Sequence, residues 1–256
     1  MRKSRLNFKI ELMCVVLLNA LLTTCCSDKN GDDLSQDSVT TFLSVSGHFS
    51  FVLYNGLSQK NAETVESKLE DNYLRVLSDL EVTSLNLVKV KIWNNETNFL
   101  DEMHSDLGIR YPGASGYVFG KGEIRLLFRG NTPQTALHEF CHAVSLEVNN
   151  RFGNNPRWFW EAVAVFEAGE FYDPTTRSYL INGNFPAIEE LNSNFNTGNA
   201  KIYEVGFLLS EYIIHHFGKT AYINLIKSNA DLELTLGTTT SQFEAGWKTF
   251  VRSKYF

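Results

Sequence analysis

The sequence predicts an α+β fold with a small, mostly antiparallel N-terminal sheet and a C-terminal helical lobe. Short segments rich in aromatic and β-branched residues occur in the first half of the 256-residue chain, whereas apolar residues at helical spacing dominate the second half. With 43% hydrophobic and 13% aromatic residues, the chain can bury a substantial core. Its length fits one domain or one two-lobed unit.

In the N-terminal half, each predicted element ends at turn residues or begins at a cap. Aromatic and β-branched residues predict strands, apolar residues four apart predict a helix, and glycines between two strands predict a hairpin. These elements are a strand at Ser46–Tyr54, a helix with apolar residues from Val65 to Leu80, a strand at Leu85–Trp93, and a hairpin of Tyr117–Phe119 and Glu123–Phe128.

In the C-terminal half, prolines after capping residues indicate helix starts. Thr132-Pro133 begins a helix that we expect to run to about Asn149, and Asn155-Pro156 begins a second one. Apolar periodicity then predicts further helices at Ile188–Leu191, Ile202–Phe217, Ala221–Lys227 and Ser241–Tyr255.

Residues 1–24 have the layout of a signal peptide. Basic residues precede the apolar run Leu12–Leu22, which is too short for a permanent membrane span of about 20 residues. Leu22-Thr23-Thr24-Cys25 resembles the lipobox of bacterial lipoproteins, in which the cysteine is acylated, and Cys26 is an alternative acceptor. We therefore expect a lipid anchor at Cys25.

The polar, acidic stretch Ser27–Asp33 resembles the tether of Bacteroidota lipoproteins that are exported to the cell surface. This resemblance implies an acylated cysteine and flexible tether over residues 25–40. It implies an exported outer-membrane lipoprotein, facing the periplasm or the cell surface. A cleaved signal followed by a disordered start is the alternative.

The charge balance argues against nucleic-acid binding through a basic face. The formal net charge is −6, and it becomes more negative without the leader, which holds four basic residues against one acid. Cys141 is the only cysteine after the anchor, so no internal disulfide is available.

The segment His138-Glu139-Phe140-Cys141-His142 carries the strongest chemical signal. Residues i and i+4 of a helix lie on one face, so both imidazoles can bind one zinc ion. The intervening Glu139 can take a proton from a zinc-activated water. The alternative interpretation is that the histidines are polar surface residues of an amphipathic helix. A third ligand at a suitable position would argue against this alternative.

Glu161 supplies that ligand from the second predicted helix, with 18 residues between it and His142. Here the chain resembles the gluzincin metallopeptidases, in which a glutamate on the next helix completes a site of two histidines and one carboxylate. It looks closest to small peptidase MA-like lipoprotein domains. The alternative for Glu161 is a helix-start acid favoured by the helix dipole.

The resemblance implies a zincin-like domain over residues 41–256, with the sheet and HExxH helix at about 41–152 and the helical lobe at about 153–256. It implies one zinc ion per chain, held by His138, His142 and Glu161, with Glu139 as general base. Tyr203 is the candidate oxyanion donor. A peptide or protein substrate would pair with Glu123–Phe128 as the edge strand.

Two positions depart from the family pattern. Ala162 replaces the usual glycine after the third ligand, and Val165 stands where thermolysin-like enzymes have an aspartate that orients a histidine. Another group must orient that histidine. Cys141 lies in an apolar stripe and is expected in the core, while Glu167 and Glu170 are expected to be a solvated helix face and end.

Three alternatives to a peptidase remain. A zinc hydrolase of a non-peptide amide or ester would use the same residues. A catalytically silent, zinc-binding surface lipoprotein is a second, although ligation alone does not need Glu139. A lipid-anchored module without metal is the third. The sequence does not specify the substrate, endopeptidase or exopeptidase action, or the oligomeric state.

Overall fold

Five strands form one mixed sheet in the computed structural model, which describes residues 38–193 and 200–256. In spatial order the strands are β1 (Thr40–Leu43), β2 (Phe49–Leu53), β3 (Val88–Trp93), β5 (Glu123–Leu127) and β4 (Gly116–Phe119). The three central strands are parallel, and only the two edge strands run antiparallel to their neighbours. The α+β class is confirmed, but the prediction of a mostly antiparallel sheet is wrong.

Crossover helices explain the parallel pairs. Helix α1 (Gln59–Asp79) connects β2 to β3, and a connection through a helix returns the chain to the start of a parallel neighbour. Helix α2 (Glu96–Leu107) leaves β3 and leads to the β4–β5 hairpin. The sequence patterns did not predict α2 or β1.

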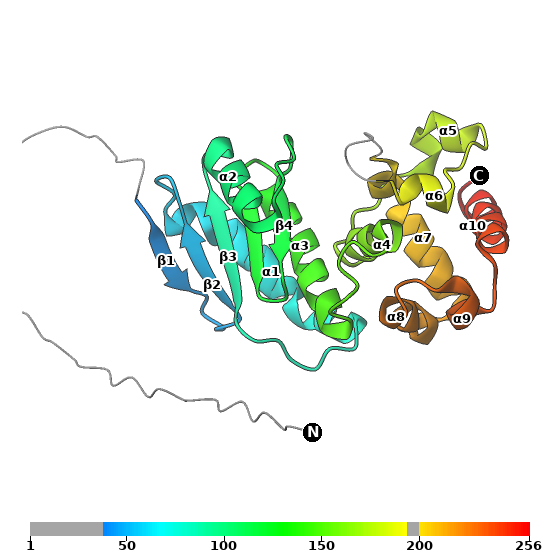
Figure 1. Ribbon diagram of the computed structural model, residues 1–256, viewed down its shortest axis with the longest axis horizontal. Coiled ribbons are helices and arrows are strands. Elements are labelled where there is room, and N and C mark those ends of the chain that lie inside the picture. The colour runs from blue at the N-terminus through cyan, green and yellow to red at the C-terminus, as the bar shows by residue number, and fades with distance from the viewer. Residues whose placement is uncertain (1–37, 194–199) are drawn as a thin grey trace, which may run out of the picture. The chain divides into compact units, whose positions relative to one another are not determined.

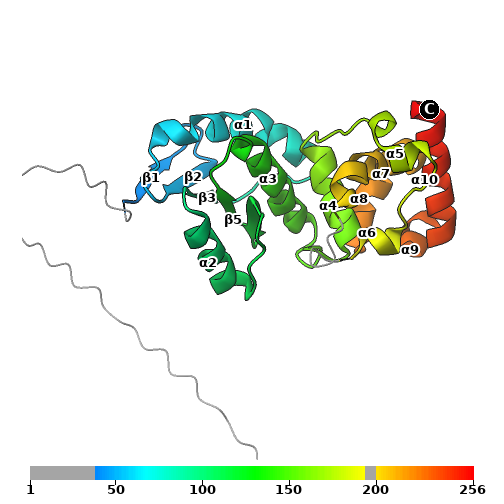
Figure 2. The ribbon, with the colours of Figure 1, turned by 90° about the horizontal axis from the view of Figure 1, so that it is seen from above.

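Helices cover both faces of the sheet (Figure 2). Helices α1 and α3 (Thr132–Val148) lie on one face, over a row of buried residues that includes Phe51, Val90 and Ile124. Helix α2 lies on the other face, over a smaller cluster around Trp93 and Phe99. Helix α3 is therefore packed against the sheet.

The helical lobe begins with α4 (Arg157–Glu167), which packs against α3 and α7 (Lys201–Phe217) (Figure 1). Most of the predicted helices are confirmed within two residues. The remaining elements are the 3-10 turn η1 (Pro174–Thr176), α5 (Ser178–Ile181), α6 (Ile188–Leu191), α8 (Lys219–Lys227), α9 (Leu232–Leu236) and α10 (Thr240–Tyr255).

Two small residues let α4 and α7 approach closely. A Cβ atom placed on Gly206 of α7 would lie 3.0 Å from the Cα atom of Ala162. Ser210, one turn further along α7, donates a hydrogen bond of 2.9 Å to the carbonyl oxygen of Ala162. Alanine is therefore accommodated after Glu161 because α7 supplies the glycine.

The expected signal peptide and the anchor cysteines, Cys25 and Cys26, lie outside the described residues. The described residues all belong to one compact unit. The strand β1 begins at Thr40, the last residue of the expected tether. Within the described part of the chain, no helix is both long and apolar enough to cross a membrane.

Candidate metal centre

The two histidines of the HExxH segment lie one turn apart on α3, which is packed among the sheet, α1 and α4. His138 and His142 are 8% and 4% exposed. Their ring centroids are 4.8 Å apart, with the ring planes nearly perpendicular. Both rings turn Nε2 toward the same carboxylate, as the i, i+4 spacing predicts.

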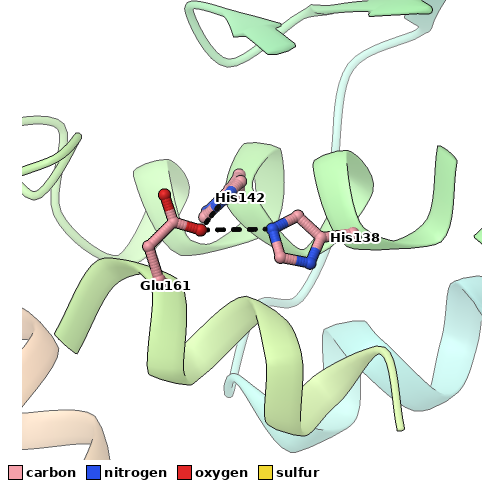
Figure 3. Close-up of side chains that lie close together, drawn as sticks. All are labelled: His138, His142 and Glu161. Atoms are coloured by element: carbon pink, nitrogen blue, oxygen red, sulfur yellow. Dashed lines mark hydrogen bonds and ion pairs between the residues drawn. The ribbon is translucent and has the colours of Figure 1, made fainter. Parts of the chain in front are cut away.

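That carboxylate belongs to Glu161 on α4 (Figure 3). Its Oε2 atom is 3.3 Å from Nε2 of His138 and 3.5 Å from Nε2 of His142. A tetrahedral ion with bonds of about 2.1 Å separates neighbouring ligand atoms by about 3.4 Å. The three residues, whose donor atoms all lie within 4.8 Å of one another, could therefore hold a metal ion.

The pKa values of these residues shift in different directions, because burial and hydrogen bonds oppose one another. Burial would raise the pKa of Glu161, but hydrogen bonds from the two histidines hold it well below its usual range. Burial lowers the pKa of His142 to about 4, so this imidazole is neutral at pH 7. Burial also opposes charge on His138, but hydrogen bonds with Glu161 and Glu170 raise its pKa well above the usual value. An ionised carboxylate thus lies between two imidazoles.

Glu139 lies beside this group and against the start of β4. A Cβ atom on Gly116 would come within 3.1 Å of Oε1 of Glu139 and within 2.8 Å of a methyl group of Thr135, so this position requires glycine. Glu139 is 7% exposed, and burial raises its pKa to about 8. A carboxyl group whose pKa lies near the working pH can both accept and release a proton.

The edge strand next to Glu139 is β4, and the expectation that Glu123–Phe128 forms this edge is wrong. That segment is β5, which pairs with β3 on one side and β4 on the other. Both strands of a hairpin have strand-like sequences, so their pattern does not tell which one continues the sheet. Gly116, in the edge strand itself, lies next to Glu139.

Tyr203 reaches the centre from the first turn of α7. Its ring centroid is 6.1 Å from that of His138, and the guanidinium carbon of Arg157 lies 5.8 Å from its ring centroid. Burial and the charge of Glu161 raise the pKa of Tyr203 well above its usual value, against the effect of Arg157. The hydroxyl therefore keeps its proton at neutral pH. Its part in catalysis stays a prediction.

Two residues near the histidines were not recognised from the sequence. Nδ1 of His138 lies 3.2 Å from Oε2 of Glu170. The carboxylate that contacts this histidine therefore comes from position 170 and not from position 165, which is a valine. Trp160 stacks on His142, with ring centroids 3.9 Å apart. The expectation that Glu170 is a solvated helix end is wrong, because its side chain is only 20% exposed.

The predictions for two other side chains have opposite outcomes. The expectation that Glu167 lies on a solvated face is wrong, because this residue is 3% exposed and forms an ion pair with Arg75 at 3.4 Å. Cys141, expected in the core, is fully buried. A sequence signal for Glu170 does exist, since a glycine near the end of a helical pattern, here Gly169, indicates a turn that can fold the next residue back.

No protein-family model matches the chain, and no curated protein matches its sequence. The site therefore defines a class by its own chemistry: a candidate metal-binding protein with two histidines and one glutamate from two packed helices.

Proposed function

We propose that this protein is a zinc-dependent metallopeptidase with a zincin-like fold, of the gluzincin type. It acts outside the cytoplasm, on a membrane surface, through a lipid anchor at Cys25 or Cys26. The observation that carries the proposal is the convergence of His138, His142 and Glu161, with Glu139 buried beside them.

The donor set favours zinc over other common ions. Two imidazoles and one carboxylate are typical of catalytic zinc sites, which leave the fourth tetrahedral position to water, whereas calcium and magnesium prefer oxygen ligands. A bound zinc ion supplies a Lewis acid and lowers the pKa of a bound water to about 7. The ligand-atom distances near 3.4 Å are compatible with such an ion.

The protein's own residues then have separate roles. Glu139 accepts the proton of the attacking water and later passes it to the leaving amine. Tyr203 donates its hydroxyl hydrogen to the carbonyl oxygen of the substrate, where negative charge develops. Burial raises the pKa of Glu139 to about 8, near enough to neutral for proton exchange in both directions, and it raises the pKa of Tyr203, whose hydroxyl therefore keeps its proton.

The edge strand supports a peptide over a small ester or amide as substrate. The outer edge of β4 has no strand partner among the described residues, and Gly116 at its start lies against Glu139. An extended peptide can add to such an edge through backbone hydrogen bonds. This pairing would bring a scissile bond past Glu139.

The test begins with zinc analysis of the protein purified from cells that express the full chain. We expect about one zinc per chain, lost in Glu161→Ala and His138→Ala. A peptide library is then incubated with the wild type and with Glu139→Gln. The variant should keep zinc and lose turnover, because its amide cannot accept a proton.

The outcomes separate the alternatives. Turnover in Glu139→Gln equal to the wild type would remove Glu139 from the mechanism. Zinc without turnover of any peptide would favour a silent metal-binding lipoprotein or, if esters are cleaved, a non-peptide hydrolase. No zinc in the wild type, even after reconstitution, would leave a module without metal.

A further inference from the structure

His138 is oriented by a hydrogen bond to a carboxylate. Its Nδ1 atom lies 3.2 Å from Oε2 of Glu170, while its Nε2 atom faces Glu161. An ionised carboxylate only accepts hydrogen bonds, so this contact keeps a proton on Nδ1. A metal ion at the centre would replace the proton on Nε2 and bind the lone pair of that atom.

The end of α4 explains how Glu170 reaches this position. Gly169 has a φ of +69°, the left-handed conformation that glycine adopts without strain. The N–H of Glu170 donates to the carbonyl of Val165, and the N–H of Gly169 donates to that of Phe166. These two bonds form a Schellman turn, which folds residue 170 back toward α3.

A second residue of α3 holds the carboxylate in place. Nε2 of Gln134 donates to Oε1 of Glu170 at 3.3 Å and to the carbonyl of Ala168 at 2.9 Å. Gln134 lies one turn before His138 on the same helix face. The carboxylate therefore bridges two side chains of α3 and is fixed relative to the histidine.

His142 is oriented differently, by stacking. The ring of Trp160 lies 3.9 Å from the ring of His142, centroid to centroid, and the planes are inclined by 10°. Among the described residues, the buried Nδ1 atom of His142 has no hydrogen-bond partner. Trp160 is itself 6% exposed and is held edge-on by Phe152 at 5.4 Å.

We infer that Glu170 and Trp160 are positioning residues of the metal centre, Glu170 through a hydrogen bond to His138 and Trp160 through stacking on His142. This inference rests on the proposed zinc site. Neither residue donates a ligand atom in the proposed set. Each restricts the rotation of one imidazole, so that less orientational freedom is lost when the ion binds.

The Glu170 half of the inference is tested by zinc affinity, measured by competition with a chromophoric chelator. Loss of an outer-shell partner of a metal-binding histidine typically weakens binding by about 10–100-fold. We expect a loss in this range for Glu170→Ala and a smaller one for Glu170→Gln, which keeps a hydrogen-bond acceptor. The matched control is Glu167→Gln, three residues away, whose carboxylate faces Arg75 and not a histidine.

The Trp160 half has a spectroscopic test. Zinc binding to an imidazole stacked on an indole should change the fluorescence of Trp160, so titration of the wild-type protein should show a zinc-dependent change in emission. Trp160→Phe, which keeps a ring for stacking, should lose this change while its zinc affinity stays within about threefold. Trp158→Phe is the control, because Trp158 packs on Phe243 and should leave the change intact.

A third variant, Trp160→Leu, removes the stacking ring and should weaken zinc binding by about tenfold or more. Circular dichroism verifies that Trp160→Leu folds, and Trp160→Phe carries the test if it does not.

Zinc affinity equal to the wild type in Glu170→Ala, or an equal loss of affinity in Glu167→Gln, would overturn the role of Glu170. A zinc-dependent emission change that persists in Trp160→Phe would overturn that of Trp160. If the wild type binds no zinc, the proposed function fails instead.

Discussion

The candidate metal centre and the Arg125 cluster, which lies on the other face of the sheet, both hold carboxylates that are partly or fully buried, but the groups that pair with these carboxylates differ. The Arg125 cluster consists of Arg125, Lys91, Glu102, Asp106 and Glu123. Arg125 forms ion pairs with Asp106, with Glu102 at 2.9 Å and with Glu123 at 2.8 Å. Lys91 adds a second cation, 3.3 Å from Glu123.

In the metal centre the ion pairs of Glu161 and Glu170 that the described residues form are with imidazoles only. Glu139 adds a third carboxylate, whose pKa is raised by burial and by the charges of Glu161 and Glu170. The carboxylates of the Arg125 cluster have arginine and lysine as counter-charges. The carboxylates beside the imidazoles belong to a group that could hold a metal ion.

The largest expected effect is the stabilisation of the fold by the proposed zinc ion. At a free zinc concentration of about 1,000 times Kd, binding adds about 4 kcal/mol to the free energy of unfolding. For a chain of this size each kcal/mol shifts Tm by about 2–4 °C. A chelator should therefore lower Tm by about 10 °C, as measured by differential scanning calorimetry.

His142→Gln is the control for this prediction, because it removes one ligand at nearly constant volume. Its Tm should not respond to zinc or chelator. A chelator-dependent shift that remains in this variant would mean that the ion binds elsewhere.

A smaller loss is expected when the Arg125 cluster is broken. Arg125 is 3% exposed, and Arg125→Met leaves Asp106, whose side chain is 11% exposed, without its cation, whereas Glu102 and Glu123 keep Lys91. Breaking a buried ion pair costs about 3–5 kcal/mol, and we expect about 3 kcal/mol because Glu102 is partly exposed. Urea unfolding measures this change, and zinc content should stay at one per chain.

The double variant Arg125→Met, Asp106→Leu sharpens this test. Asp106→Leu removes the carboxylate that Arg125→Met leaves without a cation, so part of the lost free energy of unfolding should be recovered. A double variant less stable than the single one would mean that Asp106 stabilises the fold independently of Arg125, through Tyr117, whose hydroxyl donates to it at 2.8 Å.

The smallest effect concerns Glu167, a buried carboxylate whose cation, Arg75, is 43% exposed. Burial and the charge of Asp79 raise the pKa of Glu167 from 4.5 to about 7, against the effect of Arg75. Because the pKa of Glu167 is higher in the folded state than in the unfolded state, protonated Glu167 adds to the free energy of unfolding. This addition is complete below about pH 4.5 and is lost as pH rises through 7. Glu167→Gln should not show this pH-dependent loss of stability.

The measurement is urea unfolding of the metal-free wild type and Glu167→Gln between pH 5 and 8. The difference between them should change by roughly 2 kcal/mol in favour of the variant as pH rises. Glu147→Gln, which alters a partly exposed carboxylate beside Lys121, is the control and should follow the wild type. A constant difference across this range would mean that Arg75 keeps Glu167 ionised.

Much of the candidate site could be predicted because its parts are local. The i, i+4 spacing places His138 and His142 on one helix face whatever surrounds it. The prolines at 133 and 156 begin both helices at a definite position, which fixes where Glu161 falls along the second one. The apolar stripe of α3 likewise indicated that Cys141 is buried.

The parts that were missed depend on which segments pair across the fold. A strand, helix and strand in succession favour a parallel pair, and this signal in β2, α1 and β3 outweighs the hairpin that suggested an antiparallel sheet. The edge strand β4 could not be told from β5, because both have strand-like sequences.

By itself, the sequence determined the α+β class, the positions of the three candidate ligands along their helices, and the identity of the acid beside them. The positions of these residues follow from spacing within one helix or one turn. Only the tertiary structure decided which groups fix the two imidazoles. Glu170 reaches His138 because α4 ends in a left-handed turn against α3, and Trp160 reaches His142 because the two helices pack together. Contacts between helices depend on their crossing, which no local pattern specifies.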